Sequence, residues 1–338
     1  MASPEPGLAD DGRWLDAAAR LAGRGRPLSR PNPAVGAILV RDGRVVGRGW
    51  TQTGGRPHAE AMALAAAGNA ARGATLYVTL EPCAHASARG PACADLTATA
   101  GLARVVIGCG DPDPRTAGAG IARLRQSGTP VTLVQSAACE DSLAGYLVRS
   151  RLGRPHVTLK LALSLDGCIA RADGESQWIT GAEARAHTHA MRGQADALLV
   201  GGGTVRADAP RLDVRLPGLE HRSPERWVLT RGAAPEGWPK GWNALPAPDA
   251  LGTIPAAQYL FVEGGAQTAA AFLAADLVDR VLIYRAPILI GGGLPGIADI
   301  GLTRLADAHG RWRNTDRRTL GSDTLEVYER TRNHNEVP

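Results

Sequence analysis

The feature that most constrains this chain is a set of metal-binding side chains in a fixed order. His58 stands in the segment Pro57-His58-Ala59-Glu60, and Cys83 and Cys93 follow it. One imidazole and two thiolates form the mixed nitrogen and sulfur set that suits Zn²⁺. Three protein ligands, rather than four, leave one coordination position for water, as in catalytic zinc sites. The order therefore predicts a catalytic site that holds one zinc ion per chain.

Glu60 follows the histidine closely enough to move protons beside the metal without ligating it. A His-x-Glu segment followed by Pro-Cys and a second Cys is typical of hydrolytic zinc deaminases, in which two residues separate the cysteines. Here nine residues, Ala84 to Ala92, separate Cys83 from Cys93. Because this insert is small, polar and contains Gly and Pro, it predicts an exposed loop between converging ligands. Half-buried cysteines and a surface histidine would explain each residue alone, but not the ordered set.

Local patterns predict how the ligands converge. Apolar runs at Val35–Val40 and Val45–Trp50, joined at Asp42-Gly43, indicate a β-hairpin. Ala59–Ala67 is Ala-rich and predicts a helix with His58 and Glu60 at its N-terminal end. Leu76–Leu80 indicates a strand, after which Pro82 suits the first turn of another helix. Two helix N-termini would then face the metal, and their dipoles would lower the pKa of the thiols.

The remaining pattern of the first half alternates between strands and a helix. Strands are expected at Arg104–Ile107 and Val131–Val134, with a helix at Gly120–Gln126 between them. Alternation of this kind predicts an α/β domain with a mixed sheet.

Two glycine-rich turns mark the second half. Leu198–Val200 is an apolar run that opens into three glycines and Thr204, and Tyr259–Gly265 repeats this arrangement before a helix expected near Gln267. Such turns let backbone amides approach a phosphate or a nicotinamide. A tight turn would explain either one alone, but two in one domain favour a dinucleotide. Neither is a Gly-x-Gly-x-x-Gly fingerprint, so an ordinary Rossmann domain is not supported.

Lys160 is informative because lysine is rare here. Of 38 Lys and Arg residues, only Lys160 and Lys240 are lysines. A lysine within an apolar strand can give up its proton, unlike arginine, and could polarise or protonate a carbonyl oxygen during reduction. The alternative is an edge-strand lysine whose ammonium group reaches solvent.

Several longer motifs resemble one family over nearly the whole chain. The first half contains Arg30–Gly36, Gly55–Glu60, Leu80–His85 and Gly110–Pro114, and the second contains Lys160–Gly167, Ser176–Gly181 and Ala195–Val205. These stretches resemble the bifunctional riboflavin-biosynthesis enzymes, which fuse a pyrimidine deaminase to a pyrimidine reductase. The resemblance implies an α/β protein with an N-terminal, cytidine-deaminase-like three-layer domain with a mixed sheet and a C-terminal α/β domain similar to dihydrofolate reductase.

The resemblance also implies two reactions. The zinc domain would hydrolyse the 2-amino group of 2,5-diamino-6-ribosylamino-4(3H)-pyrimidinone 5′-phosphate, and the second domain would use NADPH to reduce the ribosyl group to ribityl.

The chain departs from the family pattern in two places. The segment that precedes the second zinc cysteine, usually Gly-Arg-Thr-Pro-Pro-Cys, is here Ser87–Cys93 and one residue longer. The stretch from Thr230 to Gln258 is shorter than expected.

Residue roles carry over by motif position, with Lys160 our own catalytic candidate beside Glu60. The resemblance implies a zinc site of His58, Cys83 and Cys93. The expected cofactor contacts are Ala162, Trp178, Thr204, Asp208, Thr230, Gly264 and Gly265. The expected substrate contacts are Asn32, His85, Ser176, Arg192, Leu212, Arg215 and Glu263.

Length and composition predict two domains. We expect a disordered tail at 1–10, the deaminase domain at 11–150, the reductase domain at 151–330 and a tail at 331–338.

The N-terminus lacks a secretory signal and no apolar run is long enough to span a membrane, so the cytoplasm is the default location. Cys109, Cys139 and Cys168 are expected to be reduced. The partner is a small phosphorylated pyrimidine, and a homo-oligomer is compatible with the chain.

The sequence is also compatible with two other functions. The net charge of +5 permits a nucleic-acid-editing deaminase with an appended binding domain. However, the arginines are scattered, so no nucleic acid is expected, and this reading leaves Lys160–Asp208 and Glu263 unexplained. The other alternative is a structural zinc protein. Glu60 argues against it, because a structural site needs no proton shuttle and normally closes with a fourth ligand.

Overall fold

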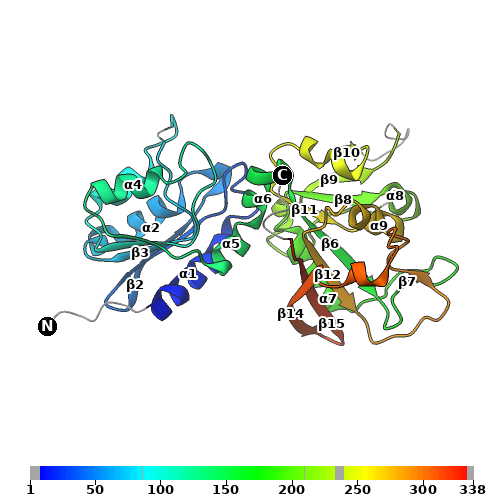
Figure 1. Ribbon diagram of the computed structural model, residues 1–338. Helices are drawn as coiled ribbons and strands as arrows, with labels where there is room; N and C mark the ends of the chain where they lie inside the picture. The colour runs from blue at the N-terminus through cyan, green and yellow to red at the C-terminus, as the bar shows by residue number, and fades with distance from the viewer. Residues whose placement is uncertain (1–7, 86, 209, 233–239, 333–338) are drawn as a thin grey trace. The chain divides into compact units, whose positions relative to one another are not determined.

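The chain forms two compact units. The computed structural model describes residues 8–85, 87–208, 210–232 and 240–332, and it divides into Met1–Arg151 and Leu152–Pro338 (Figure 1). The sequence placed this boundary at residues 150 and 151. The first helix begins at Leu8, within the expected N-terminal tail, and Arg332 in the expected C-terminal tail bonds to Asp279. The rest of both expected tails lies outside the described residues.

The first unit contains a five-stranded mixed sheet in the order β2-β1-β3-β4-β5. Strand β1 is antiparallel to β2 and β3, whereas β3, β4 and β5 are parallel. The strands are β1 (Gly36–Arg41), β2 (Arg44–Trp50), β3 (Thr75–Val78), β4 (Arg104–Ile107) and β5 (Val131–Leu133). The helices are α1 (Leu8–Ala22), α2 (Ala59–Ala67), α3 (Cys93–Thr99), α4 (Ala119–Gln126), α5 (Ala137–Ser142) and α6 (Ala144–Leu152), the last of which ends at the unit boundary.

Helices cover both faces of this sheet because successive strand residues point to opposite sides. Ile38 and Val40 of β1 pack in one core with Leu15 of α1. Ala37 and Leu39 pack in the other core with residues of α2 and α4. The result is the three-layer arrangement with a mixed sheet that the sequence predicted (Figure 1).

The local predictions are confirmed in this unit with one exception. The hairpin at Asp42-Gly43, the helix Ala59–Ala67 and the strand Arg104–Ile107 are all present. The prediction of a helix starting at Pro82 is wrong, because α3 begins only at Cys93. The first amides of α3 bond to Cys83 itself, whose sulfur and carbonyl oxygen accept the amides of Cys93 and Ala94. Residue 83 therefore lies just outside the helix that its side chain helps to cap.

The second unit is built on an eight-stranded sheet in the order β10-β9-β8-β11-β6-β12-β15-β14. The six strands from β10 to β12 are parallel, and β15 and β14 are antiparallel. Its eight strands are β6 (His156–Leu163), β8 (Ala197–Gly201), β9 (Glu225–Leu229), β10 (Trp242–Leu245), β11 (Tyr259–Val262), β12 (Arg280–Arg285), β14 (Trp312–Leu320) and β15 (Asp323–Arg330). Two further strands, β7 (Cys168–Ala170) and β13 (Leu294–Pro295), form a separate antiparallel pair. The helices are α7 (Ala182–Arg192), α8 (Gly202–Asp208) and α9 (Ala266–Ala274).

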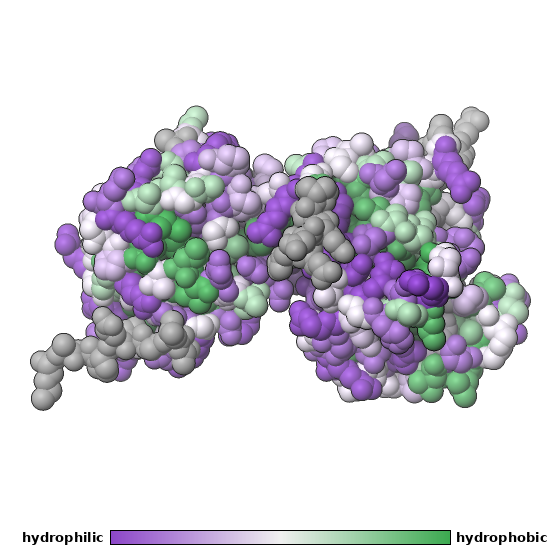
Figure 2. Space-filling view, viewed as in Figure 1, coloured by the Kyte–Doolittle hydropathy of each residue, from purple (hydrophilic) through white to green (hydrophobic). Residues whose placement is uncertain are grey.

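Two apolar cores lie on the two faces of the large sheet. Phe272 of α9 packs with Leu159 and Leu161 of β6 in one of them. Ala184 of α7 and Val205 of α8 pack in the other. The surface drawn in Figure 2 mixes hydrophilic and hydrophobic side chains over both units. None of the helices in the described ranges has the length and apolar character needed to cross a membrane.

The position of β6 shows whether Lys160 lies on an edge strand or inside the sheet. Strand β6 lies between β11 and β12, well inside the sheet. The edge-strand alternative is therefore wrong. Lys160 is half-buried on a central strand, where a lysine has a desolvation cost that a surface position would avoid.

Two glycines of β2 let α2 approach the sheet closely. A Cβ on Gly49 would lie 2.3 Å from the carbonyl oxygen of Ala59 and 2.6 Å from the amide nitrogen of Ala63. A Cβ on Gly47 would lie 2.4 Å from the carbonyl oxygen of Ala63. Because the obstructing atoms belong to helix backbone, they cannot rotate away. These glycines therefore determine how closely α2 packs on β2, and with it the positions of His58 and Glu60.

We expect Gly49→Ala to destabilise the β2–α2 contact by about 1–3 kcal/mol, the usual cost of overpacking. Native-state hydrogen exchange of the amides in β1, β2 and α2 measures this locally. The matched control is Gly12→Ala in α1, where no neighbouring atom lies within 4 Å of the added Cβ. This control should be neutral or more stable by up to about 1 kcal/mol, because alanine favours helix. Equal effects of the two substitutions would contradict the packing argument.

Candidate functional site

The three expected metal ligands meet in the first unit. Their donor atoms all lie within 4.8 Å of one another. His58 Nδ1 is 3.3 Å from Cys93 Sγ and 3.6 Å from Cys83 Sγ. A tetrahedral zinc ion bound at the usual Zn–N and Zn–S lengths would separate these atoms by ~3.5 Å. The donor set and its spacing therefore fit zinc.

Three different elements deliver these ligands. His58 is the N-cap residue of α2, Cys83 lies in the loop after β3, and Cys93 is the first residue of α3. The Cys93 amide donates to Cys83 Sγ over 3.3 Å. Two helix N-termini thus face the site, as expected, although the second belongs to Cys93 rather than to Pro82.

The two thiols shift each other's pKa in opposite directions. The hydrogen bond from Cys93 lowers the pKa of Cys83 well below the usual thiol value, with further help from His58 and the Cys93 amide. The pKa of Cys93 is raised in turn, by the hydrogen bond with Cys83 and by burial. A divalent cation suits this pair, because it would stabilise the thiolate form of both sulfurs.

Glu60 lies in the first turn of α2 and is only 3 % exposed. Burial raises the pKa of its carboxyl group, and the charge on His58 partly offsets this effect. A raised pKa makes a carboxyl group a better proton acceptor than a free carboxylate, which is the property that a proton shuttle needs. Glu60 therefore has the position and the acidity expected of a proton shuttle.

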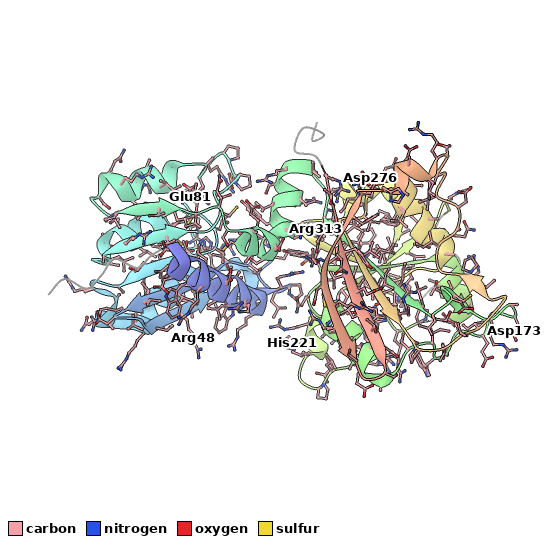
Figure 3. All side chains as sticks on the ribbon, turned by 60° about the horizontal axis from the view of Figure 1, so that its bottom comes forward. Arg48, Glu81, Asp173, His221, Asp276 and Arg313 are labelled. Carbon is pink, nitrogen blue, oxygen red and sulfur yellow. The ribbon has the colours of Figure 1, made fainter. Side chains whose placement is uncertain are left out.

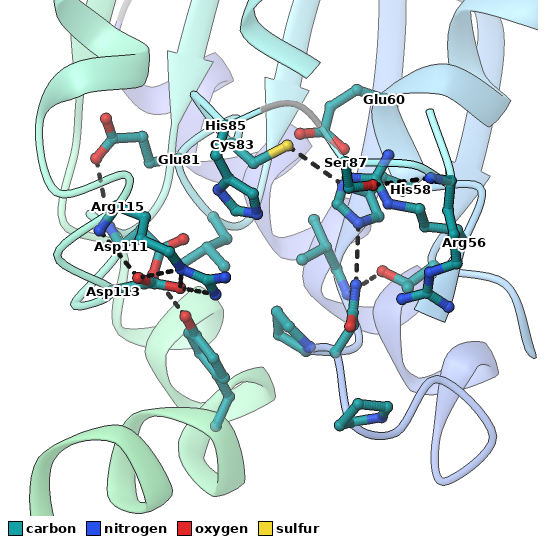
Figure 4. A pocket seen from close by; sticks show the side chains of 18 residues that line it. Arg56, His58, Glu60, Glu81, Cys83, His85, Ser87, Asp111, Asp113 and Arg115 are labelled. Atoms are coloured by element: carbon teal, nitrogen blue, oxygen red, sulfur yellow. Dashed lines mark hydrogen bonds and ion pairs between the residues drawn. The ribbon is translucent and has the colours of Figure 1, made fainter. Parts of the chain in front are cut away.

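A pocket of about 320 Å³ opens in front of these residues (Figure 4). Its lining includes His58, Glu60, Cys83, Asn32 and His85. Asn32 Nδ2 donates to the carbonyl oxygen of Gly55 over 3.0 Å and lies 3.1 Å from His58 Nε2, so the Asn32 amide packs against the edge of the imidazole ring. The predicted substrate contacts of Asn32 and His85 stay predictions, but both residues line the pocket.

Glu81 anchors one wall of this pocket, a role that sequence reasoning did not assign. It is 3 % exposed and lies inside the first unit (Figure 3). Its carboxylate accepts the amides of Ile121 at 3.0 Å, Gly118 at 3.1 Å and Asp111 at 3.4 Å. Because all these partners are backbone groups, Glu81 holds the loop between β4 and α4 in one position.

Tyr146 is a second anchor that the sequence did not reveal. Its hydroxyl donates to Asp111 Oδ1 over 2.6 Å, and Asp111 Oδ1 also accepts the amide of Asp113. Burial raises the pKa of Asp111, while the bond from Tyr146 works in the opposite direction. Asp111, Asp113 and Tyr146 all line the pocket, so α6 supports the wall opposite His58.

The second unit brings three of the predicted residues together. Arg192, at the end of α7, donates to Glu263 through Nε at 2.5 Å and Nη2 at 2.9 Å. Burial lowers the pKa of Lys160 below its usual value, an effect that the charge of nearby Glu263 partly offsets. Burial alone would raise the pKa of Glu263, but Arg192 and Lys160 outweigh it and lower the pKa.

Most predicted cofactor residues lie at one edge of the large sheet. Ala162 is near the end of β6, and Thr204, Thr230 and Gly264-Gly265 follow β8, β9 and β11. Because these strands are parallel, their carboxyl ends share an edge, where open α/β sheets bind ligands. Asp208 is exposed at the end of α8. Of the three glycines, Gly201 ends β8, and Gly202 and Gly203 start α8 instead of forming an open turn.

The two glycine turns meet at the first turn of α9. A Cβ on Gly201 or on Gly264 would lie 2.3 Å from side-chain atoms of Thr268. Only glycine leaves room for this contact, so the turns after β8 and β11 are adjacent. The ends of β8 and β11 therefore lie side by side at the start of α9.

The other predicted residues of this unit lie in different surroundings. Trp178 is 64 % exposed, and the guanidinium of Arg185 lies 4.8 Å from its ring centre. Ser176 is half-buried, and Arg215 is exposed and paired with Asp213 at 3.5 Å. The Leu212 side chain is buried in the core with α7 and α8. No observation tests the expected ligand contacts of these four residues, which stay predictions.

Known proteins match both units. Residues 8–109 match the cytidine and deoxycytidylate deaminase zinc-binding region, and residues 155–237 and 250–325 match the RibD C-terminal domain. The riboflavin biosynthesis protein RibD of Escherichia coli (strain K12) is 39% identical over 88% of this chain and 94% of its own length.

Solved structures agree with this match along the chain. The structure of Acinetobacter baumannii RibD, form 1, is similar with a TM-score of 0.84 and 34% identity, covering 96% of this chain and 100% of that one. A diaminohydroxyphosphoribosylaminopyrimidine deaminase/5-amino-6-(5-phosphoribosylamino)uracil reductase from Thermotoga maritima has a TM-score of 0.84 and 31% identity, covering 95% of this chain and 99% of that one. The chain belongs to the RibD family of riboflavin biosynthesis proteins, with a cytidine-deaminase-like unit followed by a RibD reductase unit.

Proposed function

We propose that this chain catalyses two consecutive steps of riboflavin biosynthesis on one phosphorylated pyrimidine. Membership of the RibD family gives the chain its deaminase and reductase activities. The proposed substrate is 2,5-diamino-6-ribosylamino-4(3H)-pyrimidinone 5′-phosphate, which loses its 2-amino group before its ribosyl group is reduced. The observation that carries the proposal is the pocket that places buried Glu60 beside the His58, Cys83 and Cys93 donor set.

In the deaminase step, His58, Cys83 and Cys93 would hold the zinc ion, one per chain. A bound zinc ion supplies a Lewis acid that makes water nucleophilic at neutral pH. The Glu60 carboxylate would take one proton from the attacking water and pass it to the ring nitrogen; when the C–N bond breaks, it would pass the second water proton, from the newly added hydroxyl group, to the amino group that leaves as ammonia. Asn32 lies beside the imidazole of His58, and Asn32 and His85 are proposed to contact the base.

In the reductase step, NADPH is the proposed hydride donor. Hydride addition at C1′ of the ribosyl group opens the sugar ring, and the released ring oxygen must gain a proton. Lys160 is our candidate for this proton transfer, because burial lowers its pKa toward the range of a useful acid. Arg192, Glu263, Ser176, Leu212 and Arg215 are the proposed substrate contacts. The cofactor would bind at the edge formed by Ala162, Thr204, Thr230, Gly264 and Gly265, with Trp178 and Asp208 nearby.

The alternative of a nucleic-acid-editing deaminase is not favoured, because the second unit matches the RibD C-terminal domain at residues 155–237 and 250–325. We also infer a cytoplasmic location, and a homo-oligomer is compatible with the proposal.

The metal prediction separates ligands from the proton shuttle. Cys83→Ser and Cys93→Ser should lose zinc, because each removes one of only three protein ligands. Glu60→Gln should keep about one zinc per chain while deamination falls by ~10²-fold or more. Metal analysis of the purified proteins and product mass spectrometry measure both results. The control Cys109→Ser changes a buried cysteine outside the cluster and should keep its zinc. Loss of zinc from Glu60→Gln would overturn the assigned role.

The two activities should also be separable. Lys160→Met should lower reduction of the supplied deaminated intermediate by ~10²-fold or more, because it removes the proposed proton donor. Its deaminase activity should not change, whereas Glu60→Gln should show the opposite pattern. The control is Lys240→Met, which removes the exposed second lysine of the chain. If either Lys160→Met or Glu60→Gln abolished both activities in a folded protein, the two-site proposal would fail.

The short stretch from Thr230 to Gln258 generates a prediction about the cofactor. Fewer contacts to the adenosine end would weaken the ground and transition states equally, which raises KM and leaves kcat unchanged. We expect weak NADPH saturation, measurable reduction at high NADPH, and modest preference over NADH. Parallel titrations with both cofactors measure this. Tight and strongly NADPH-selective saturation would contradict the prediction.

A further inference from the structure

Two arginines tie together the loops at the mouth of the zinc pocket. Arg56 precedes His58 by two residues, and Arg89 lies in the loop between the two zinc cysteines. The Arg56 guanidinium donates to the carbonyl oxygen of Pro91 over 3.3 Å, and the Arg89 guanidinium donates to that of Gly54 over 2.8 Å. Each arginine therefore bonds to the main chain two residues from the other arginine: Pro91 lies two residues after Arg89, and Gly54 lies two residues before Arg56. This reciprocal pattern brings both cationic groups to the same side of the pocket, which both residues line.

The local backbone is shaped for this contact. Ser87 and Gly90 exchange amide–carbonyl hydrogen bonds at 3.1 and 3.0 Å, which forms a tight turn with Arg89 near its tip. Ser87 Oγ also accepts the amide of Arg89 at 3.2 Å. Gly90 has a φ of +142°, and a Cβ there would lie 3.2 Å from Arg56 Nη1. The loop thus presents Arg89 while leaving room for Arg56.

Both arginines lack a carboxylate partner within the described chain. Neither takes part in any of the ion pairs found there, whereas Arg115, on the opposite wall, is paired with Asp113 at 2.5 Å. A guanidinium has five N–H donors, so each arginine keeps most of its donors after bonding to one carbonyl. Two uncompensated cations with spare donors form a site for an anion.

The charge of the two walls decides where that anion would lie. Glu60 and the metal donors occupy the buried end of the pocket, and Asp111 and Asp113 line one wall. Figure 4 shows Arg56 and Ser87 on the side of His58, away from Asp111 and Asp113. A phosphate would be repelled by the acidic wall and attracted by the arginine wall. With the pyrimidine ring at Glu60, the phosphate end of the substrate would extend toward the mouth.

We propose that Arg56 and Arg89 form a binding site for the 5′-phosphate of the pyrimidine substrate in the deaminase pocket. This inference rests on the proposed function, because it assumes a phosphorylated pyrimidine as the substrate. The site makes the loop between the zinc cysteines part of substrate recognition as well as a connection between two ligands. Arg115 is excluded from the site because its guanidinium is engaged by Asp113 through both carboxylate oxygens.

The test compares the phosphorylated substrate with the same ribosylaminopyrimidine lacking phosphate. Arg56→Gln and Arg89→Gln should each raise KM for the phosphorylated substrate by about tenfold, the usual effect of losing a hydrogen bond to a charged group. The kcat should stay within about twofold of the wild type, and the kinetics with the dephosphorylated compound should not change. Metal analysis should still find about one zinc per chain. The control Arg123→Gln removes an exposed arginine outside the pocket, paired with Asp95 at 3.0 Å, and should behave as wild type.

The possible results separate this inference from the proposed function. Equal losses with both compounds would show that the arginines only hold the loops, and unchanged KM values would show no role in binding; either result overturns the inference. A wild-type protein that deaminates the dephosphorylated compound but not the phosphorylated one would also overturn it. A zinc-loaded wild type that deaminates neither compound would refute the proposed function, and the inference would fall with it.

Discussion

The two hydrogen bonds that Cys83 accepts from the start of α3 are the constraint on which the deaminase unit depends. The amide of Cys93 bonds to the sulfur and that of Ala94 to the carbonyl oxygen. These bonds close the long loop between the cysteines, so its length need not weaken the site. They also place the positive end of a helix next to a thiolate, which favours the charged ligand. Because Cys83 is held by α3 and His58 by α2, the metal site requires both helices to pack correctly on the sheet.

That packing depends on small residues. Gly47 and Gly49 let α2 lie against β2, and Ala59 and Ala63 on the facing side are fully buried. Small side chains on both surfaces bring the helix backbone close to the strand. Glu60 is thereby buried between the sheet and the metal donors, and its burial raises its pKa. The chemistry of the site therefore follows from the close approach of two backbones, which larger apolar residues would have prevented.

The sequence predicted the elements well where one local pattern determined them. The Asp42-Gly43 hairpin and the helix Ala59–Ala67 follow from turn chemistry and composition, and both are present. The helix expected at Pro82 was wrong because proline at a first turn is permitted but not required there, and long-range bonds to α3 determined the backbone instead. Glu81 could have drawn attention as an acid next to a ligand, but its three amide partners lie on a distant loop. Tyr146 gave no signal at all, since its role depends on where α6 meets Asp111.

The two units handle buried charge in different ways, and this difference bears on their chemistry. In the first unit, charge gathers on sulfur, imidazole and carboxyl groups that a cation can neutralise. In the second, Arg192 and Glu263 satisfy each other with two hydrogen bonds, and Lys160 is a third charge beside a pair that is already balanced. Removing either partner of such a buried pair commonly costs about 3–5 kcal/mol, because the other is left unpaired. The Lys160 ammonium group belongs to no such hydrogen-bonded pair among the described residues, although the charge of Glu263 favours its protonated form. Lys160 is therefore the member of this cluster that we propose as the proton donor, because its loss of charge would leave the Arg192–Glu263 pair intact.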